Sequence, residues 1–452
     1  MLDKLISVGL DVGTTTTQMV VSALEVENKG NAFSVPEMVI ENREILYQSP
    51  VIFTPLQSHD RVDGEAIARW VETQYAAAGI TKNKVDTGAV IITGETSRKE
   101  NAKEVLHHLS GFAGDFVVAT AGPDLESVLA AKGAGATAYS EDTGKTVLHI
   151  DIGGGTSNMA FIEKGKILRT GCLNVGGRLI KLDETGKITY LSPVLRDLCH
   201  LSVGQIPTPD QLSEIADLLT QGLEMAAGLR PATNLLDHLT TRENAGTWEI
   251  QKADVISFSG GVADCIEHAH PPQTFGDIGV HLGQAIRRSQ LCQNPYRLGE
   301  QTIRATVIGA GCYATCLSGS TVYCAGVKLP RKNLPVAVLP MPVTAEAVQE
   351  ACQKQDTAVA LAISGYTAPT YEQVQQMAKA IVSGCGGREI LVCLEADMAK
   401  ALGHAICLLQ PETPCLCIDR VKLQPESFLD IGAPVGPSFP VVVKTLVLSN
   451  NQ

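Results

Sequence analysis

Aromatic side chains are scarce in this sequence: phenylalanine, tyrosine and tryptophan together make up 4% of its 452 residues. Runs of basic residues are missing as well, and the formal net charge is −12. A surface that binds nucleic acid or an anionic membrane needs clustered positive charge, and single-stranded nucleic acid also needs aromatic rings on which its bases stack. We therefore expect no nucleic-acid partner and no membrane partner.

Long apolar segments are missing too. No segment approaches the roughly 18 consecutive apolar residues of a membrane-spanning helix. The first residues, MLDKLIS, have no basic stretch ahead of an apolar one, so we expect no secretory signal and predict a cytoplasmic protein. With 452 residues, 44% of them hydrophobic, the chain is too long for one ordinary domain and long enough for a large core.

The CxxC pair of many redox and zinc sites does not occur, although the sequence contains 13 cysteines. Most of them stand in apolar runs, which favours reduced, buried thiols over a disulfide framework or a metal site. Cys415 and Cys417 are the closest pair. They alternate along a predicted strand, so both thiols should point to the same face of the sheet.

Strand and helix patterns alternate through most of the chain, which is typical of largely parallel sheets covered by helices. The start differs, because residues 5–12, 18–26 and 37–41 read as a meander of strands. Other predicted strands are residues 90–93, 116–119, 146–152, 254–258, 335–339, 358–363, 389–394, 415–419 and 440–448. Predicted helices are residues 63–78, 97–109, 124–138, 208–230, 282–290, 302–313, 344–354, 371–383 and 397–409.

Prolines mark one clear division of the chain. Four of them stand between residues 328 and 342, and the strand–helix alternation restarts after them. We therefore predict an α/β fold in three parts: lobe I at residues 1–145, lobe II at 146–327, and a C-terminal α/β domain at 343–452.

One strand-to-turn pattern occurs twice, 140 residues apart. Residues 8–17 read VGLDVGTTTT and residues 148–157 read LHIDIGGGTS, so each apolar strand ends in Asp, an apolar residue and Gly. Glycines after a strand let backbone N–H groups approach phosphate oxygens, and hydroxyl groups can add donors. A single Asp-x-Gly turn is weak evidence, but two copies at matching strand ends predict a site that holds phosphates from both sides.

The two aspartates, Asp11 and Asp151, cannot bind phosphate directly because like charges repel. They fit a site in which a Mg²⁺ ion with its water shell lies between carboxylate and phosphate. One of them could also orient an attacking water. A third glycine turn, FSGGVA at residues 258–263, could lie flat against a purine or ribose.

Two other features have plainer interpretations. Residues 430–432 repeat the Asp-x-Gly form, but Pro434 and Pro437 follow where hydrogen-bond donors would be needed, so we read a structural turn. His149 and the pair His107-His108 lack metal-ligand spacing, and we read them as structural residues.

These segments, in this order, resemble the actin-like ATPase superfamily of Hsp70 chaperones, actin and sugar kinases. The matching segments cover roughly residues 5–316 and are residues 11–15, 90–102, 122–138, 151–156, 259–262 and 305–311. The resemblance implies two lobes around a nucleotide cleft. It also implies that ATP and Mg²⁺ bind there, that Asp11 and Asp151 hold the metal through water, and that Glu126 helps to place the hydrolytic water.

The same resemblance implies the nucleotide-binding residues. The first phosphate motif would contribute Gly13, Thr14 and Thr15; the second would contribute Gly153, Gly154, Gly155 and Thr156; the adenosine motif would contribute Ser259, Gly260 and Gly261. Arg98 belongs to the matching segment at residues 90–102. Small residues at 133–136 and 309–311 would let two connecting helices cross closely, which suits either a hinge or plain close packing.

The whole chain also resembles the reactivating factors of ethanolamine ammonia-lyase. The similar segments are residues 7–16, 47–50, 90–98, 430–434 and 440–446. The resemblance implies a chaperone that uses ATP to release damaged cobalamin from the lyase, so that intact adenosylcobalamin rebinds. The lyase would be the direct partner and cobalamin an indirect one. A homodimer and an association with the ethanolamine-utilisation microcompartment are further expectations.

Two other functions stay open from the residues alone. One is a small-molecule kinase of the same fold, which needs a base beside an acceptor hydroxyl. The other is an actin-like filament protein. Metabolite-stimulated ADP release would indicate the first, and sedimentation on adding ATP the second.

Overall fold

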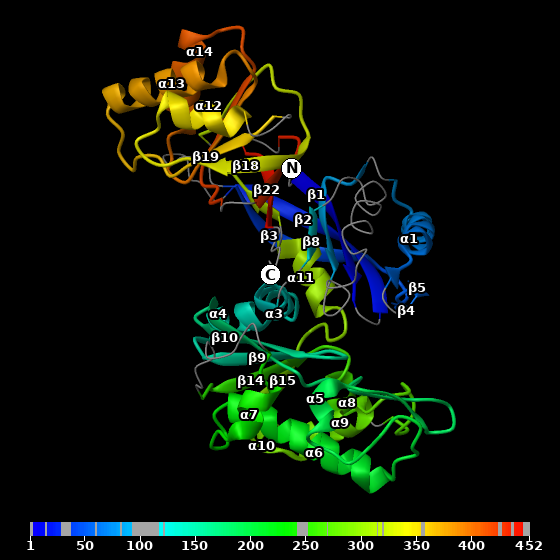
Figure 1. The fold of residues 1–452 in the computed structure, drawn as a ribbon. Coiled ribbons are helices and arrows are strands. Elements are labelled where there is room, and N and C mark those ends of the chain that lie inside the picture. Colours follow the sequence, from blue (N-terminus) through cyan, green and yellow to red (C-terminus); the bar gives the residue numbers. More distant parts are fainter. Residues whose placement is uncertain are drawn as a thin grey trace.

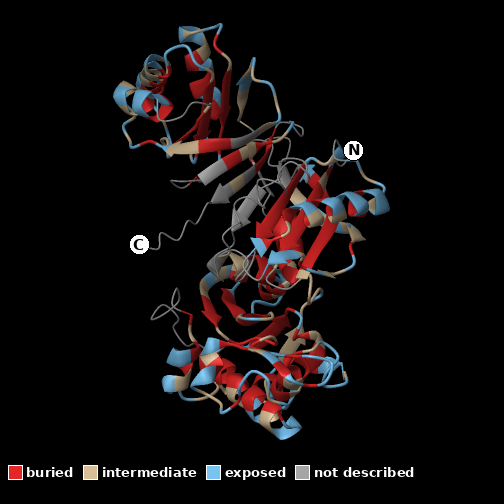
Figure 2. Ribbon diagram, turned by 45° about the vertical axis from the view of Figure 1, so that its right-hand side comes forward, coloured by how far each residue is buried: buried red, intermediate tan, exposed pale blue. Residues whose placement is uncertain are grey.

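The computed structural model describes residues 3–13, 16–28, 38–58, 61–81, 84–92, 117–120, 123–241, 252–268, 270–313, 315–318, 321–353, 358–423, 427–434 and 438–445. Figure 1 shows three α/β parts, drawn in blue to cyan, in green, and in yellow to red. Figure 2 shows buried strands inside each part and exposed helix faces outside. The α/β fold class expected from the sequence is confirmed.

The sheet of lobe I is built around β1 (Asp3–Val12). On one side β1 pairs antiparallel with β2 (Thr16–Asn28), and on the other it pairs parallel with β7 (Thr87–Ile92). The outer strands are β3 (Met38–Gln48), β4 (Ile52–Phe53) and β8 (Val117–Thr120). The remaining elements are the ribbon β5 (Leu56–Ser58) with β6 (Arg61–Val62), and α1 (Gly64–Ala78).

The sheet of lobe II repeats this order around β9 (Val147–Ile152). On one side lies the antiparallel β10 (Ser157–Glu163), and on the other the parallel β14 (Val255–Ser259). The outer strands are β11 (Lys166–Leu173) and β15 (Tyr296–Leu298). Smaller elements are β12 (Ile180–Leu182), β13 (Ile188–Leu191), α5 (Pro193–Arg196), α6 (Pro209–Ala226), α7 (Asn234–Leu239), α8 (Asp264–Glu267), α9 (Gly279–Arg288) and α10 (Gln290–Gln293).

The two lobes are therefore two copies of one topology. In each copy a helix follows the fifth strand of the main sheet order: α3 (Pro123–Gly133) after β8, and α11 (Ala305–Tyr313) after β15. These two helices lie between the two sheets (Figure 1). The meander expected at the start of the chain is confirmed in lobe I. Lobe II also begins with three antiparallel strands, so the expectation of largely parallel pairing is wrong for that half of its sheet.

Helix boundaries follow the capping signals where those are strong. Asp63 caps α1 by accepting a hydrogen bond from the Ala66 N–H, and Thr208 with Gln211 forms a capping box at α6. The single helix predicted over residues 124–138 is wrong. The chain breaks at Gly135, whose φ is +73°, and continues as α4 (Ala136–Thr143).

The third part contains an eight-stranded sheet of order β16-β23-β22-β18-β19-β20-β21-β17. Its strands are β16 (Thr315–Leu317), β17 (Tyr323–Ala325), β18 (Arg331–Val338), β19 (Ala360–Ile363), β20 (Ile390–Leu394), β21 (Cys415–Ile418), β22 (Ser427–Ile431) and β23 (Pro440–Thr445). The helices α12 (Ala345–Gln353), α13 (Tyr371–Cys385) and α14 (Ala399–Leu409) share one apolar core with one face of this sheet. A separate apolar cluster covers the other face.

Cys415 and Cys417 point to the same face, as predicted, and their Sγ atoms are 3.8 Å apart in the buried core. No helix among the described residues has the length and apolar content to cross a membrane. The predicted helix 97–109, Arg98, the His107-His108 pair, Thr14 and Thr15 lie outside the described residues.

Candidate functional site

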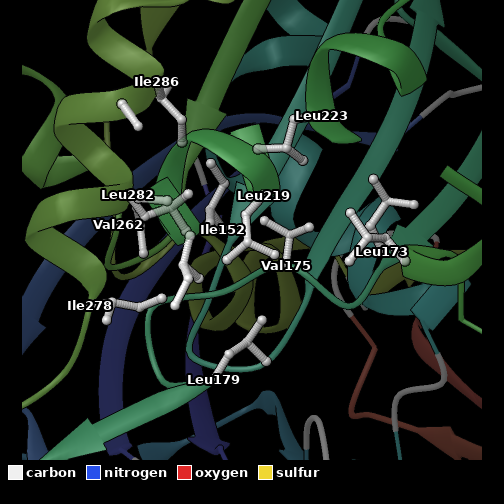
Figure 3. Close-up of a cluster of buried hydrophobic side chains, with 14 of the residues drawn as sticks. Ile152, Leu173, Val175, Leu179, Leu219, Leu223, Val262, Ile278, Leu282 and Ile286 are labelled. Atoms are coloured by element: carbon white, nitrogen blue, oxygen red, sulfur yellow. The ribbon is translucent and has the colours of Figure 1, made fainter. Parts of the chain in front are cut away.

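Asp11 and Asp151 occupy matching positions at the ends of β1 and β9, each near the middle of its sheet. Both are buried, with exposed fractions of 8% and 6%. Successive side chains of a strand point to opposite faces of the sheet, so the two carboxylates point away from the face that their apolar neighbours occupy. Figure 3 shows one of these neighbours, Ile152, packed with Val175, Leu219 and Leu282 in the core of lobe II. Each aspartate is therefore held by a strand whose neighbouring side chains are locked in a core.

Glu126 lies close enough to both aspartates to interact with their charges. It lies on α3, and its surroundings raise the pKa of its carboxyl to about 8. Loss of solvent is the largest cause, the negative charges of Asp151 and then Asp11 add to it, and a hydrogen bond with Asn158 opposes it. The fold thus brings together all three carboxylates predicted from the sequence. We call Asp11, Glu126 and Asp151 the three-carboxylate site.

Two amide side chains complete this site, and the sequence analysis missed both. Gln18 lies opposite Asp11 in the β1–β2 register, and Asn158 lies opposite Asp151 in the β9–β10 register. Each follows its aspartate by seven residues, which is a signal that the repeated motif could have provided. Gln18 Oε1 and Asn158 Oδ1 are buried without a hydrogen-bond partner among the described residues. Converging carboxylates and unpartnered amide oxygens are ligands suited to a hydrated hard cation.

A chain of hydrogen bonds leads from Asp151 into the core of lobe II. The hydroxyl of Ser259 donates to Asp151 Oδ1, and Thr306 of α11 also hydrogen-bonds to this carboxylate. Burial nevertheless raises the pKa of Asp151 to about 6. His149 lies between Ser257 and Ser259, with its Nδ1 3.1 Å from Ser257 Oγ and its Nε2 3.0 Å from Ser259 Oγ. His149 therefore orients the serine that holds Asp151.

Burial lowers the pKa of His149 to about 3, and the positive charge of Arg297 contributes. The ring is consequently neutral at physiological pH and carries one N–H. It can donate to only one of its two serines and accept from the other.

The two predicted phosphate loops have the same backbone closure. The Gly13 N–H donates to the Thr16 carbonyl and the Gly153 N–H donates to the Thr156 carbonyl, each over 2.9 Å. A second glycine pair, Gly176-Gly177, supports the loop of lobe II, and the sequence analysis did not single it out. A Cβ atom at Gly176 would lie 2.4 Å from the Gly154 carbonyl oxygen, so only glycine fits there. Gly155 has nothing within 4 Å on its Cβ side, which leaves the loop open outward.

The predicted adenosine turn, Ser259–Gly261, packs against the end of β9. Ser259 pairs with Asp151 in the β14–β9 register. Gly260 has φ of +88°, and a Cβ atom there would lie 2.3 Å from the Ile152 carbonyl oxygen. The turn is therefore next to the second phosphate loop, where a bound nucleotide could span both.

The raised pKa of Glu126 gives a test of the site without any ligand. The folded-state pKa of Glu126, about 8, exceeds the ordinary value of 4.5. The protonated Glu126 carboxyl therefore contributes its full stability to the folded state below about pH 4.5, and this contribution is lost as the pH rises through 8. Glu126→Gln cannot ionise. We expect it to raise the thermal midpoint relative to wild type by a few degrees at pH 9 and by less at pH 5.

This measurement is made by calorimetry of the nucleotide-free protein in EDTA. Glu184→Gln, at an exposed turn, is the matched control and should show no such pH dependence. An equal difference in thermal midpoint between Glu126→Gln and wild type at both pH values would mean that the pKa of Glu126 is not raised in the folded protein.

The family model and the curated relatives agree over nearly the whole chain. The model of the family described as ethanolamine utilisation protein EutA matches residues 3–449. Two proteins described as ethanolamine ammonia-lyase reactivase EutA, from Salmonella typhimurium and Escherichia coli, are 37% and 38% identical to this chain. Each alignment covers 98% of this chain and 98% of the relative.

Two similar solved structures have low sequence identity to this chain. A Ppx/GppA family member from Aquifex aeolicus is 13% identical, with a TM-score of 0.42 over 68% of this chain and 97% of that one. The ethanolamine utilisation protein EutJ from Carboxydothermus hydrogenoformans is 18% identical, with a TM-score of 0.35 over 69% of this chain and 92% of that one.

Proposed function

This chain belongs to the EutA family of ethanolamine utilisation proteins, and we propose from that premise that it is the ATP-dependent reactivating chaperone of ethanolamine ammonia-lyase. The relatives described as reactivases align with it over 98% of their own length. The family relationship favours the reactivase over the kinase and the filament protein considered from the sequence.

One observation supports the ATP-dependent part of this proposal: Glu126, on the helix between the lobes, is close enough to Asp11 and Asp151 for both charges to raise its pKa. Bound Mg²⁺ would neutralise phosphate charge at this point. Asp11 and Asp151 would accept hydrogen bonds from the waters of its shell. Gln18 Oε1 and Asn158 Oδ1, which have no hydrogen-bond partner within the described part of the chain, would serve the same purpose.

The remaining residues would bind the phosphates, bind the adenosine and position the attacking water. The N–H groups of Gly13 and Gly153 close their own loops, so the remaining backbone N–H groups of the two loops would donate to the phosphates. Ser259–Gly261 would lie against the adenosine. Glu126 would orient the attacking water and, when ionised, accept its proton.

Coupling to the partner would run through the contact between the lobes. ATP and ADP make different contacts with the two loops, and a ligand shifts a conformational equilibrium by its difference in affinity for the two states. We propose that the lyase responds to the resulting change in lobe angle by releasing damaged cobalamin. The third part of the chain is the candidate lyase-binding element, and a homodimer and a location at the ethanolamine microcompartment complete the proposal.

The test is an activity-restoration assay. Ethanolamine ammonia-lyase is inactivated with glycerol or cyanocobalamin and then incubated with the protein, ATP, Mg²⁺ and free adenosylcobalamin. We expect lyase activity to return only when all four are present. Asp151→Asn should fail to restore activity, while the exposed Asp142→Asn should restore it like wild type.

Two results would contradict the proposal. Restoration of lyase activity without ATP would mean that reactivation does not depend on nucleotide binding at the three-carboxylate site. No restoration, together with ADP release that rises with a particular metabolite, would identify a kinase.

A further inference from the structure

Phe53 stands in lobe I next to the first predicted phosphate loop. It is 74% exposed and lies in β4, where it pairs with Thr16 at the start of β2. The next residue, Thr54, is buried, and its hydroxyl donates a hydrogen bond to the Gly13 carbonyl over 2.8 Å. The backbone that carries Phe53 is therefore fixed to the first loop.

Arg178 stands in lobe II next to the second predicted phosphate loop. Its backbone N–H donates to the Gly154 carbonyl over 2.6 Å, and the N–H of the preceding Gly177 donates to the Gly153 carbonyl over 3.1 Å. Two consecutive hydrogen bonds of this kind fix the backbone of Arg178 to that loop. A movement of the second loop therefore carries Arg178 with it.

An ion pair holds the side chain of Arg178 in place. Its Nε donates to Asp277 Oδ2 over 3.2 Å, while Asp277 Oδ1 accepts a hydrogen bond from the Gly279 N–H over 2.8 Å. Both charged side chains are largely removed from solvent, with exposed fractions of 19% for Arg178 and 8% for Asp277. Salt screens such a pair less than an ion pair on the surface. Arg178 therefore has a guanidinium group of defined position, and the flat faces of this group can stack on an aromatic ring.

The guanidinium of Arg178 lies over the ring of Phe53, so the two lobes are in contact at this point. The distance from Arg178 Cζ to the centroid of the Phe53 ring is 5.5 Å. A guanidinium within about 6 Å of a ring centroid is attracted by the negative face of the ring. Because each partner is fixed to its own loop, the two loops cannot move apart without breaking this contact.

The exposure of Phe53 has a plainer explanation, since single exposed apolar residues are common on protein surfaces. Phe53 differs from such a residue because its ring has a charged partner in the other lobe. Its 74% exposure also means that the contact can open without disturbing an apolar core. These are the properties of a contact that forms and breaks as the lobes move.

We propose that Phe53 and Arg178 form a clasp between the lobes, which holds the two phosphate loops together and slows the release of a bound nucleoside diphosphate. The effect on release rests on the proposed function, because it requires a nucleotide that both loops hold. Neither side chain is assigned to the reacting phosphate, so both are positioning residues. An exposed cation–π contact that must break before release changes the release rate by about two- to fivefold.

The first measurement tests, without nucleotide, whether the clasp holds the lobes. Spin labels are introduced through genetically encoded amino acids at the exposed positions Ala77 on α1 and Glu214 on α6, and double electron–electron resonance reports the distance between them. We expect Phe53→Leu to broaden the distance distribution and shift it to longer values. Phe53→Trp should keep the wild-type distribution, because tryptophan is the best aromatic partner of a cation. The matched control is Tyr371→Leu, which removes an aromatic ring that is 80% exposed in the third part of the chain.

The second measurement is the release of a fluorescent ADP analogue, displaced by excess ATP. Phe53→Leu should raise the dissociation rate constant about two- to fivefold, whereas Phe53→Trp should leave it at or below the wild-type value. In an Arg178→Met background, Phe53→Leu should have no further effect, because the partner of the ring is already missing. Tyr371→Leu should release the analogue at the wild-type rate.

Three results would overturn the clasp. Phe53→Leu could leave the distance distribution unchanged, release the analogue at the wild-type rate, or accelerate release equally when Arg178 is absent. A wild-type protein that binds no ADP analogue would contradict the proposed function instead. The distance measurement would then still decide whether Phe53 and Arg178 hold the lobes together.

Discussion

Asp151→Asn should lower ATP turnover by about 100-fold or more. The substitution removes a negative charge from the point where the Mg²⁺ water shell would be held. It also places an amide where Ser259 and Thr306 now hydrogen-bond to a carboxylate. Asp11→Asn, at the matching strand end of lobe I, should have a loss of similar size. The measurement is steady-state ADP release at saturating ATP.

The Mg²⁺ concentration that turnover requires distinguishes a direct role of the two aspartates in metal binding from a general loss of activity. Both variants should require more Mg²⁺ for half-maximal turnover, because the metal shell has lost an acceptor. Asp142→Asn replaces an exposed acid at the end of α4 and should turn over like wild type. Normal turnover in both variants would mean that the metal lies elsewhere, although the family relationship would stand.

Gly309→Ala should destabilise the protein by about 3 kcal/mol or more, because the added methyl group has no space. A Cβ atom at Gly309 would lie 2.0 Å from the carbonyl oxygen of Leu129 on α3. The contact is reciprocal, since a Cβ atom at Gly133 would lie 1.8 Å from the Ala305 carbonyl oxygen. Both obstacles are backbone atoms, which cannot rotate away, so α3 and α11 must separate.

Turnover should fall in Gly309→Ala along with stability. Leu129 lies one helical turn after Glu126 on α3, so a displaced α3 carries Glu126 away from the two aspartates. Thermal unfolding and ADP release measure the two effects. Gly155→Ala is the control for stability, because its methyl group would meet nothing within 4 Å and its φ lies outside the left-handed region. An unchanged midpoint in Gly309→Ala would show that the helices do not pack this closely in solution.

Local signals explain which parts of the fold were predictable. The cap at Asp63 and the capping box at Thr208 depend on residues within one turn, and the predicted starts of α1 and α6 are confirmed. The helix predicted over residues 124–138 failed for the opposite reason. Its small residues suit a helix, but the close approach of α11 at Gly133 and the left-handed backbone of Gly135 break it.

The candidate site also has a part that the local sequence predicted and a part that it did not. The repeated Asp-x-Gly turns were visible because each is a short local pattern after an apolar strand. Gln18 and Asn158 were not recognised, because their role depends on the register of an antiparallel partner strand.

The sequence by itself determined the α/β class, the duplicated Asp-x-Gly turn and the family, because strand periodicity, glycine positions and motif order are written along the chain. Only the tertiary structure decided that Glu126 lies close to Asp11 and Asp151 and that His149 orients Ser259. The physical reason is distance along the chain. Side chains separated by tens or hundreds of residues come together only when sheet register and helix packing place them, and no local preference specifies either.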